Sequence, residues 1–158
     1  AVNPSNITAG GDLQIVGSQD IEINTPNIDS LIQATGNLTI DGSGNLSIRG
    51  TLTSDAILIA SDGGLRLSDS QITSVAGGIN IVANGDALLE RSQLLSATNT
   101  SVVSQGELQI RDIATAPFIM SAGGNLNLQG ADGVDIQAQN NVASILQSGG
   151  SLSIGSIS

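Results

Sequence analysis

The sequence predicts an all-β fold, a right-handed parallel β-helix (β-solenoid) of about seven coils, each roughly 18 to 26 residues long with three short strands. Two observations predict it: a glycine that recurs at one position of a repeating unit, and apolar-x-apolar triplets that follow it. The aromatic content of 1% agrees with a narrow interior filled by branched aliphatic side chains. The right hand is the usual chirality of parallel crossovers.

Two sets of triplets supply the first two strands of each coil. The first set begins at Leu13, Leu38, Ile57, Ile79, Thr100, Phe118 and Ser144, and the second begins eight residues later in every case, at Ile21, Leu46, Leu65, Ala87, Leu108, Leu126 and Leu152. Successive side chains of a strand point to opposite faces, so the first and third members of a triplet should line the axis. We therefore expect Leu46, Leu65, Leu108 and Leu126 to stack over one another.

A third, less regular apolar position follows each second triplet. It falls at Ile28, Leu52, Ile72, Leu94, Ile113, Val134 and Ile157. Each coil therefore carries three strands. Successive copies of a strand are expected to pair in parallel, roughly 4.8 Å apart.

The recurring glycine marks the corner between the first and second strands. It stands fourth in a five-residue connection, at Gly44, Gly63, Gly85, Gly106, Gly124 and Gly150. A chain that turns sharply inside a stack favours a residue that is free to adopt positive φ. We interpret these glycines as structural and expect that conformation.

Composition excludes several classes of function. The net charge is −10, with 14 acidic residues against four arginines, and a field of that sign repels phosphate backbones and anionic lipid head groups. The chain has no cysteine or histidine, so a disulfide and a histidine or cysteine metal site are excluded. No apolar run approaches the length of a membrane span. We expect no cofactor, no nucleic-acid partner and no membrane insertion.

Catalysis is not expected either. The chain has neither lysine nor histidine to act as a general base, and its carboxylates are scattered along the sequence. We therefore assign no catalytic and no metal-ligating residue.

One group of charges is expected to form a ladder across coils. Asp69, Arg91 and Asp112 stand at equivalent positions of successive coils, so stacking in register places the arginine between two carboxylates. In the neighbouring column Glu90 lies beside Arg111. Exposed pairs contribute roughly 0 to 1 kcal/mol each, so the ladder is expected to refine register.

Two apolar residues at outward positions, Ile119 and Ile145, are expected to be neighbours on adjacent coils. They form a small apolar strip, which either contacts a partner or is covered by the inserted residues near Gln137 to Ala143. Cover by the insertion is the preferred interpretation.

The chain is expected to be a single solenoid segment over residues 1–158. Neither end shows an amphipathic capping helix, and open strand edges invite stacking. The expected partners are adjoining coils of a longer repetitive chain, or copies of this unit stacked end to end.

Glycine-rich phrases give the chain a family resemblance. Residues 9–15 (AGGDLQI), 122–128 (AGGNLNL) and 149–154 (GGSLSI) resemble repeats of filamentous-haemagglutinin-like proteins, the large exoproteins of two-partner secretion. The run 110–119 is similar to a phrase of their cyanobacterial members. The resemblance implies a β-helix that is exported through an outer-membrane partner and serves adhesion or forms fibres. Residues 3–6 match the family's secretion motif poorly, so we assign the segment to the rod.

Three classes of function follow, in order of preference. The first is an extracellular structural or adhesive rod of a haemagglutinin-like surface protein, secreted or at the cell surface. The second is a carbohydrate-binding β-helix module whose partners are cell-surface or matrix glycans, although the chain offers few aromatic platforms. The third is a polysaccharide-processing β-helix enzyme.

Overall fold

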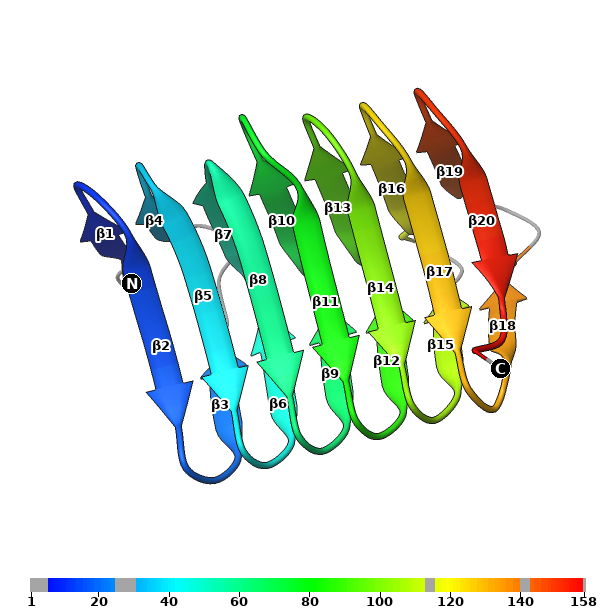
Figure 1. The fold of residues 1–158 in the computed structure, drawn as a ribbon, viewed down its shortest axis with the longest axis horizontal. Helices are drawn as coiled ribbons and strands as arrows, with labels where there is room; N and C mark the ends of the chain where they lie inside the picture. The colour runs from blue at the N-terminus through cyan, green and yellow to red at the C-terminus, as the bar shows by residue number, and fades with distance from the viewer. Residues whose placement is uncertain (1–5, 25–30, 113–115, 140–142, 158) are drawn as a thin grey trace.

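The structure is a computed structural model that describes residues 6–24, 31–112, 116–139 and 143–157. Every regular element among them is a β-strand, and the strands form three parallel sheets that wind round one axis (Figure 1). Two sheets have seven strands and the third has six, which makes about six full turns of a β-solenoid. The predicted all-β, three-strand coil is confirmed.

The three sheets, named A, B and C in chain order, take every third strand. Sheet A stacks β1 (Ile7–Ala9), β4 (Leu31–Ala34), β7 (Thr51–Ser54), β10 (Gln71–Ser74), β13 (Gln93–Ser96), β16 (Ile119–Ala122) and β19 (Ile145–Ser148). Sheet B stacks β2 (Leu13–Gly17), β5 (Asn37–Gly42), β8 (Ala56–Ser61), β11 (Ile79–Ala83), β14 (Thr100–Ser104), β17 (Leu126–Gly130) and β20 (Leu152–Gly155). Sheet C stacks β3 (Ile21–Asn24), β6 (Leu46–Arg49), β9 (Leu65–Ser68), β12 (Ala87–Glu90), β15 (Leu108–Arg111) and β18 (Val134–Gln137).

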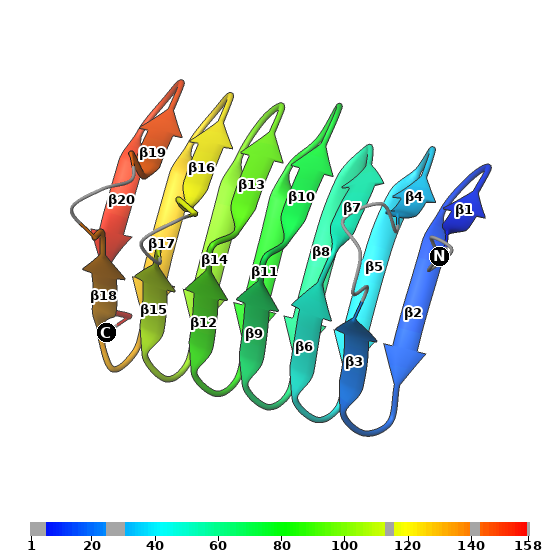
Figure 2. The same ribbon diagram turned by 180° about the vertical axis from the view of Figure 1, so that it is seen from behind.

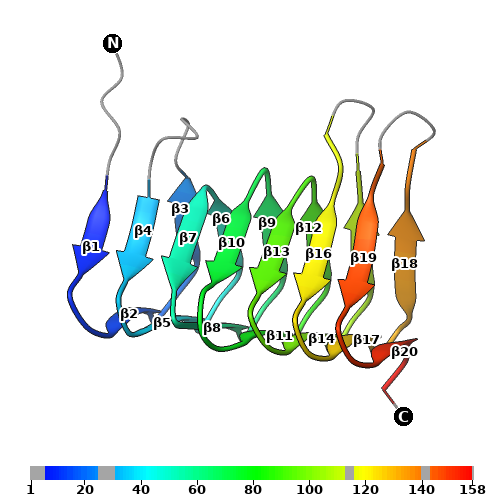
Figure 3. The same cartoon turned by 90° about the horizontal axis from the view of Figure 1, so that it is seen from above.

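The winding is right-handed. In Figure 1 the strands of sheet B lie in front and run downward, and the chain returns upward behind them while it advances from left to right. Figure 2, seen from behind, shows the returning strands of sheets C and A. Figure 3 shows sheet A in front of sheet C, with sheet B below both. This hand is the one that the twist of parallel strands favours.

Aliphatic columns along the axis form the core. Within sheet C, Ile48 pairs with Leu67, Leu67 with Leu89, and Leu89 with Ile110. All four side chains are fully buried, and outward residues alternate with them along each strand. Burial of one such side chain contributes roughly 1.5 to 3 kcal/mol, so these columns dominate the stability of the rod.

Buried serines occupy the corners where two sheets meet. Each donates its hydroxyl hydrogen to a backbone carbonyl, as Ser74 does to Asp55 (2.6 Å), Ser104 to Gly85 (2.7 Å) and Ser70 to Ile48 (2.9 Å). A small hydroxyl side chain is satisfied at a tight corner without widening the coil, and it shares carbonyls that also accept backbone N–H groups, as Gly85 does from Gly106.

The last two coils occupy the sheets differently from the prediction. Leu126 pairs with Thr100 in sheet B, and it is Val134 that stacks on Leu108 in sheet C. The segments at Phe118 and Ser144 lead into β16 and β19 of sheet A. The expected stacking of Leu126 over Leu108 is therefore wrong.

The eight-residue step explains this error. It separates sheet B from sheet C in every coil, including the step from Leu126 to Val134, but it also separates Phe118 from Leu126. Spacing alone therefore allowed two frames, that is, two assignments of the triplets to the sheets. With the correct frame, equivalent positions lie 19 to 26 residues apart along the chain.

The predicted third strands agree with sheet A only in the middle of the chain. Leu52, Ile72 and Leu94 lie in β7, β10 and β13. Val134 belongs to sheet C instead, and Ile157 follows β20 outside any strand. Ile28 and Ile113 lie outside the described residues.

Candidate functional site

The predicted corner glycines occupy two different corners. Gly44, Gly63, Gly85 and Gly106 stack between sheets B and C, where the N–H of each of the last three bonds to the carbonyl of the glycine one coil below, as in Gly85 to Gly63 (2.9 Å). Gly124 and Gly150 stack between sheets A and B, joined by a bond of 2.9 Å. This second location follows from the corrected frame of the last two coils.

The expected positive φ at these glycines is wrong. Among the described glycines, only Gly50 and Gly133 have it. The corner glycines are required for close approach instead: a Cβ at Gly106 would lie 2.1 Å from Asp86 Oδ1 and 3.0 Å from the Asp86 backbone nitrogen. A Cβ at Gly44 would lie 2.7 Å from the Asp20 backbone nitrogen.

An acidic or amide side chain lies beneath Gly36 and beneath every predicted corner glycine except Gly85, and it forms a hydrogen bond to the coil above. Its Oδ1 atom accepts the N–H of the residue that follows the corner position one coil up. These pairs are Asp12 with Asn37 (2.8 Å), Asp20 with Asn45 (2.7 Å), Asn45 with Gly64 (2.9 Å), Asp86 with Glu107 (2.9 Å), Asn99 with Asn125 (2.8 Å) and Asn125 with Ser151 (2.9 Å). The signal that reveals four of these acceptors is a Gly-Asp or Gly-Asn pair just before a strand, at residues 11–12, 44–45, 85–86 and 124–125.

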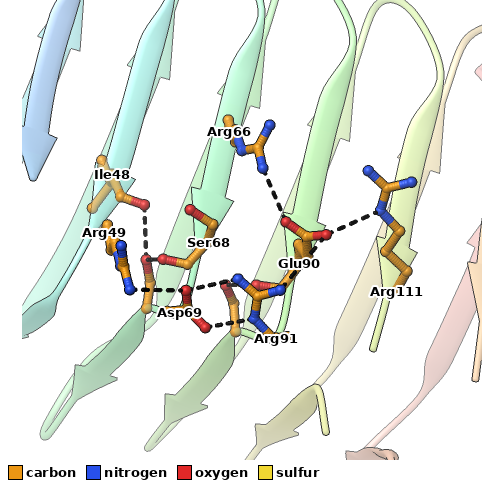
Figure 4. Close-up of polar contacts among 10 residues, drawn as sticks. Ile48, Arg49, Arg66, Ser68, Asp69, Glu90, Arg91 and Arg111 are labelled. Carbon is orange, nitrogen blue, oxygen red and sulfur yellow. Dashed lines mark hydrogen bonds and ion pairs between the residues drawn. The ribbon is translucent and has the colours of Figure 1, made fainter. Parts of the chain in front are cut away.

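All four arginines of the chain gather on one side of the rod, on sheet C and the corner that leads to sheet A (Figure 4). The arginine cluster comprises Arg49, Arg66, Arg91 and Arg111 with the carboxylates of Asp69 and Glu90. Because the chain contains no lysine, these are all of its basic side chains. Counting along coils predicted Arg91, Arg111 and the two carboxylates, but it missed Arg49 and Arg66.

Arg91 and Asp69 form the tightest pair of the cluster. Arg91 donates from Nε to Asp69 Oδ1 (2.5 Å) and from Nη2 to Oδ2 (2.7 Å). Both residues have left-handed backbone, with φ of 49° and 50°. This conformation costs a non-glycine residue roughly 1 to 2 kcal/mol, so the bidentate pair holds two strained corners together.

The expected partnership of Arg91 with Asp112 is wrong. The Asp112 carboxylate is buried, and it accepts hydrogen bonds from the Gln139 N–H (2.7 Å) and the Ser144 hydroxyl (2.6 Å). Asp112 therefore joins the chain after β15 to the connection between β18 and β19. Its buried carboxylate is the acceptor for the N–H and hydroxyl groups of that connection. The carboxylate of Asp69 lies between two arginines instead, with Arg49 Nη2 at 3.5 Å.

Glu90 is the second centre of the cluster. Its side chain is 9% exposed and contacts Arg66 at 3.0 Å, Arg111 at 3.6 Å and Arg91 at 3.9 Å. The pairing of β12 with β15 sets Glu90 opposite Arg111, the arrangement that the sequence count predicts. The Nε atom of Arg111 is buried without a hydrogen-bond partner, because its nearest Glu90 oxygen lies beyond hydrogen-bond distance.

The pair of Asp69 and Arg91 predicts a pH dependence of stability. The hydrogen bonds from Arg91 lower the pKa of the Asp69 carboxyl from its ordinary value of 3.8, against the opposing effect of partial burial. A pKa that is lower in the folded state stabilises the fold fully above the unfolded-state value, and this contribution is lost as pH falls through the folded-state value. Asp69→Asn should therefore cost about 1 kcal/mol at pH 7, and the difference from wild type should shrink below about pH 4.

Urea unfolding of wild type, Asp69→Asn, Arg91→Gln and the double variant, from pH 7 to pH 2.5, measures this contribution. Asparagine tolerates left-handed backbone, so the substitution removes charge without adding strain. A coupling energy between the two positions that stays constant down to pH 2.5 would contradict the assignment.

The predicted apolar strip has the expected neighbours. Ile119 in β16 pairs with Ile145 in β19. Ile145 is 43% exposed, so the described residues do not cover it as the preferred interpretation required. Residues 140–142 of the proposed cover lie outside the described residues.

A shallow groove of about 580 Å³ runs over the outer face of sheet C beside the arginine cluster. One column of side chains along its floor comprises Glu22, Ser47, Arg66, Leu88 and Gln109, which are paired neighbours on β3, β6, β9, β12 and β15. The acidic residues Asp20 and Asp86 also line the groove. The groove therefore combines a hydroxyl, a guanidinium, an apolar patch and an amide.

No known protein family, curated protein or solved structure matches this chain. No group of three or more acidic side chains within the described ranges is placed to hold a metal ion. No helix in the described part of the chain has the length and apolarity to cross a bilayer.

Proposed function

We propose that the chain is a structural or adhesive rod segment of an extracellular, haemagglutinin-like surface protein. The observation that carries the proposal is the unbroken stack of coils, in which every strand from β4 to β17 is paired on both sides with a parallel neighbour in register. Such a stack transmits load along its axis, because each coil is held by backbone bonds to the next. The glycine-rich phrases that resemble haemagglutinin repeats support the same assignment.

The outermost described coils support stacking with a further coil. Leu152 and Ile154 of β20 belong to the inward columns of sheet B, yet they are 48% and 45% exposed because no strand of the described residues lies over them. At the opposite face, Ile7 of β1 is 49% exposed. Open strand edges with apolar layers are the surfaces on which adjoining coils or further copies pair.

A tandem fusion of two copies of the chain tests the rod. Electron microscopy and small-angle X-ray scattering should show one straight particle, about twice as long as the single chain, because the second copy continues the winding of the first. Replacement of Leu152 and Ile154 at the junction by lysine should uncouple the two halves. A wild-type fusion that behaves as two freely jointed bodies would contradict the proposal.

Carbohydrate binding is the second candidate function. The groove on sheet C favours it, because hydroxyl, amide and apolar groups alternate along one column at the strand spacing, roughly 4.8 Å. Such a mixture suits the hydroxyl groups and C–H faces of a sugar. A glycan array probed with the labelled chain distinguishes this function from a purely structural rod.

A further inference from the structure

We propose that a second groove, on the outer face of sheet B, binds a short neutral saccharide through hydrogen bonds to the side chains of Asn80, Asn99 and Ser101. This sheet B groove has a volume of about 530 Å³ and is lined by residues of β5, β8, β11 and β14 and of the corner that precedes them. These strands face the viewer in Figure 1. The inference rests on the second candidate function, carbohydrate binding, and gives it a location and a ligand class.

The hollow follows the edge of sheet B at which the chain arrives from sheet A. Asn37, Ala56, Gly78 and Asn99 line it at equivalent positions of four successive coils, because the residues that follow them are paired. Gly78 has no side chain, and a Cβ there would lie 2.6 Å from the carbonyl oxygen of Asn99. The two small residues at the centre of this column therefore leave a hollow, with an asparagine at either end.

The floor of the sheet B groove offers the groups that a sugar ring needs. Thr39, Leu58, Asn80 and Ser101 form one column of paired neighbours along it, roughly 4.8 Å apart. Leu58 is 38% exposed and offers an apolar surface to the C–H face of a ring. The hydroxyl and amide side chains on both sides of it can donate to the ring hydroxyl groups and accept from them.

The amide groups of the sheet B groove are available to a ligand. Oδ1 of Asn99 accepts the N–H of Asn125 (2.8 Å), which orients the amide and leaves the two N–H donors of its Nδ2 atom for a ligand. The Asn80 side chain is exposed and has no hydrogen-bond partner in the part of the chain that the structure describes. In the groove on sheet C, by contrast, Arg66 is already bonded to Glu90 at 3.0 Å. A sugar on sheet B therefore replaces only water.

The distribution of charge favours a neutral sugar over an acidic one. All residues that line the sheet B groove are uncharged. Three carboxylates lie just beyond it: Asp41 is two residues after Thr39, Asp55 precedes Ala56, and Asp12 accepts the N–H of Asn37 (2.8 Å). All four arginines lie on the other side of the rod, so no cation near the groove would offset the repulsion of an acidic ligand.

The side-chain amide signals of Asn80 and Asn99 provide a direct test. The folded, ¹⁵N-labelled protein is titrated with neutral trisaccharides of glucose, galactose, mannose and N-acetylglucosamine, and with trigalacturonate and a glucosamine trimer as charged probes. At least one neutral trisaccharide should shift both signals, with a dissociation constant of about 1 mM, and trigalacturonate should bind more weakly. Absence of shifts with every neutral probe at millimolar concentration, or tighter binding of either charged probe, would overturn the proposal.

A matched pair of variants separates this groove from the rest of the surface. Asn80→Ala removes an exposed amide from the sheet B groove, and Gln71→Ala removes one from the outer face of sheet A. Asn80→Ala should weaken binding about fivefold, the effect of one neutral hydrogen bond, whereas Gln71→Ala should leave it unchanged. Circular dichroism of each variant checks that the solenoid remains folded.

The outcomes for the site and for the function are distinguishable. Equal binding by wild type and Asn80→Ala would overturn the sheet B site. If the shifts then fell on the side-chain amide of Gln109, carbohydrate binding itself would stand and its location would be the groove on sheet C, which Gln109 lines. A glycan array without any signal would contradict the function together with the site, and the tandem-fusion test of the rod would be unaffected.

Discussion

Leu89→Asp is expected to prevent folding of the chain. Leu89 is fully buried in β12, where it is stacked between Leu67 of β9 and Ile110 of β15. A carboxylate at this position would have no partner inside an aliphatic column, and an uncompensated buried charge costs several kcal/mol in addition to the lost burial. Since a domain is stabilised by only about 5 to 15 kcal/mol, the variant should show a disordered far-UV circular dichroism spectrum.

The neighbouring residue provides the matched control. Leu88 lies on the outer face of the same strand, directly opposite Arg66 of β9. Leu88→Asp should therefore fold and unfold within about 1 kcal/mol of wild type, since the new carboxylate is solvated and faces a guanidinium. Arg91→Ala should also cost only about 1 kcal/mol. Loss of folding in both aspartate variants would contradict the assignment of Leu88 to the outer face of β12 and of Leu89 to its buried face.

Gly106→Ala is expected to destabilise the rod by about 2 to 3 kcal/mol in urea unfolding. The added methyl group would overlap Asp86 Oδ1 at 2.1 Å and press on the Gly85 carbonyl carbon at 3.1 Å. To relieve this overlap either the Asp86 side chain rotates away or the coils separate, and either movement weakens the bond from Glu107 N–H to Asp86 Oδ1 (2.9 Å). The cause is close approach between coils, because Gly106 does not have positive φ.

Two further variants isolate that cause. Gly10→Ala adds a methyl group with no atom within 4 Å, so it should be neutral or stabilise by about 0.5 kcal/mol through a less flexible unfolded chain. Asp86→Ala removes the overlapping side chain, so the double variant with Gly106→Ala should lose about 1 kcal/mol less than the sum of the single effects. Additive losses would indicate that the Asp86 side chain is not what excludes a methyl group.

Much of the fold was predictable because its information is local. Alternation of apolar and polar residues in triplets such as Leu126-Asn127-Leu128 assigns the inward face of a strand without any long-range contact. The constant step of eight residues correctly joined sheet B to sheet C in the first five coils. In the last two coils the same step also linked Phe118 to Leu126, and only the pairing of Leu126 with Thr100 distinguishes the two frames.

The candidate site was less predictable, because side chains cross between coils diagonally as well as straight up the stack. Counting predicted that Glu90 stands opposite Arg111, which the pairing of β12 and β15 shows. It did not predict that Arg66 contacts Glu90, since Arg66 lies in the neighbouring column. Nor did it predict that the Asp112 carboxylate accepts hydrogen bonds from Gln139 and Ser144, because these two residues lie in a connection of irregular length.

The sequence by itself determined that the chain is a stack of three-stranded coils with an aliphatic axis, because period-two alternation and a repeating corner leave no other way to bury those side chains. Only the tertiary structure decided which strands stack on one another and why glycine is needed at the corners. It also decided that all four arginines lie on one side of the rod. The physical reason is that these depend on distances between coils, and a contact between Gly106 and Asp86 or between Arg66 and Glu90 exists only once the stack has formed.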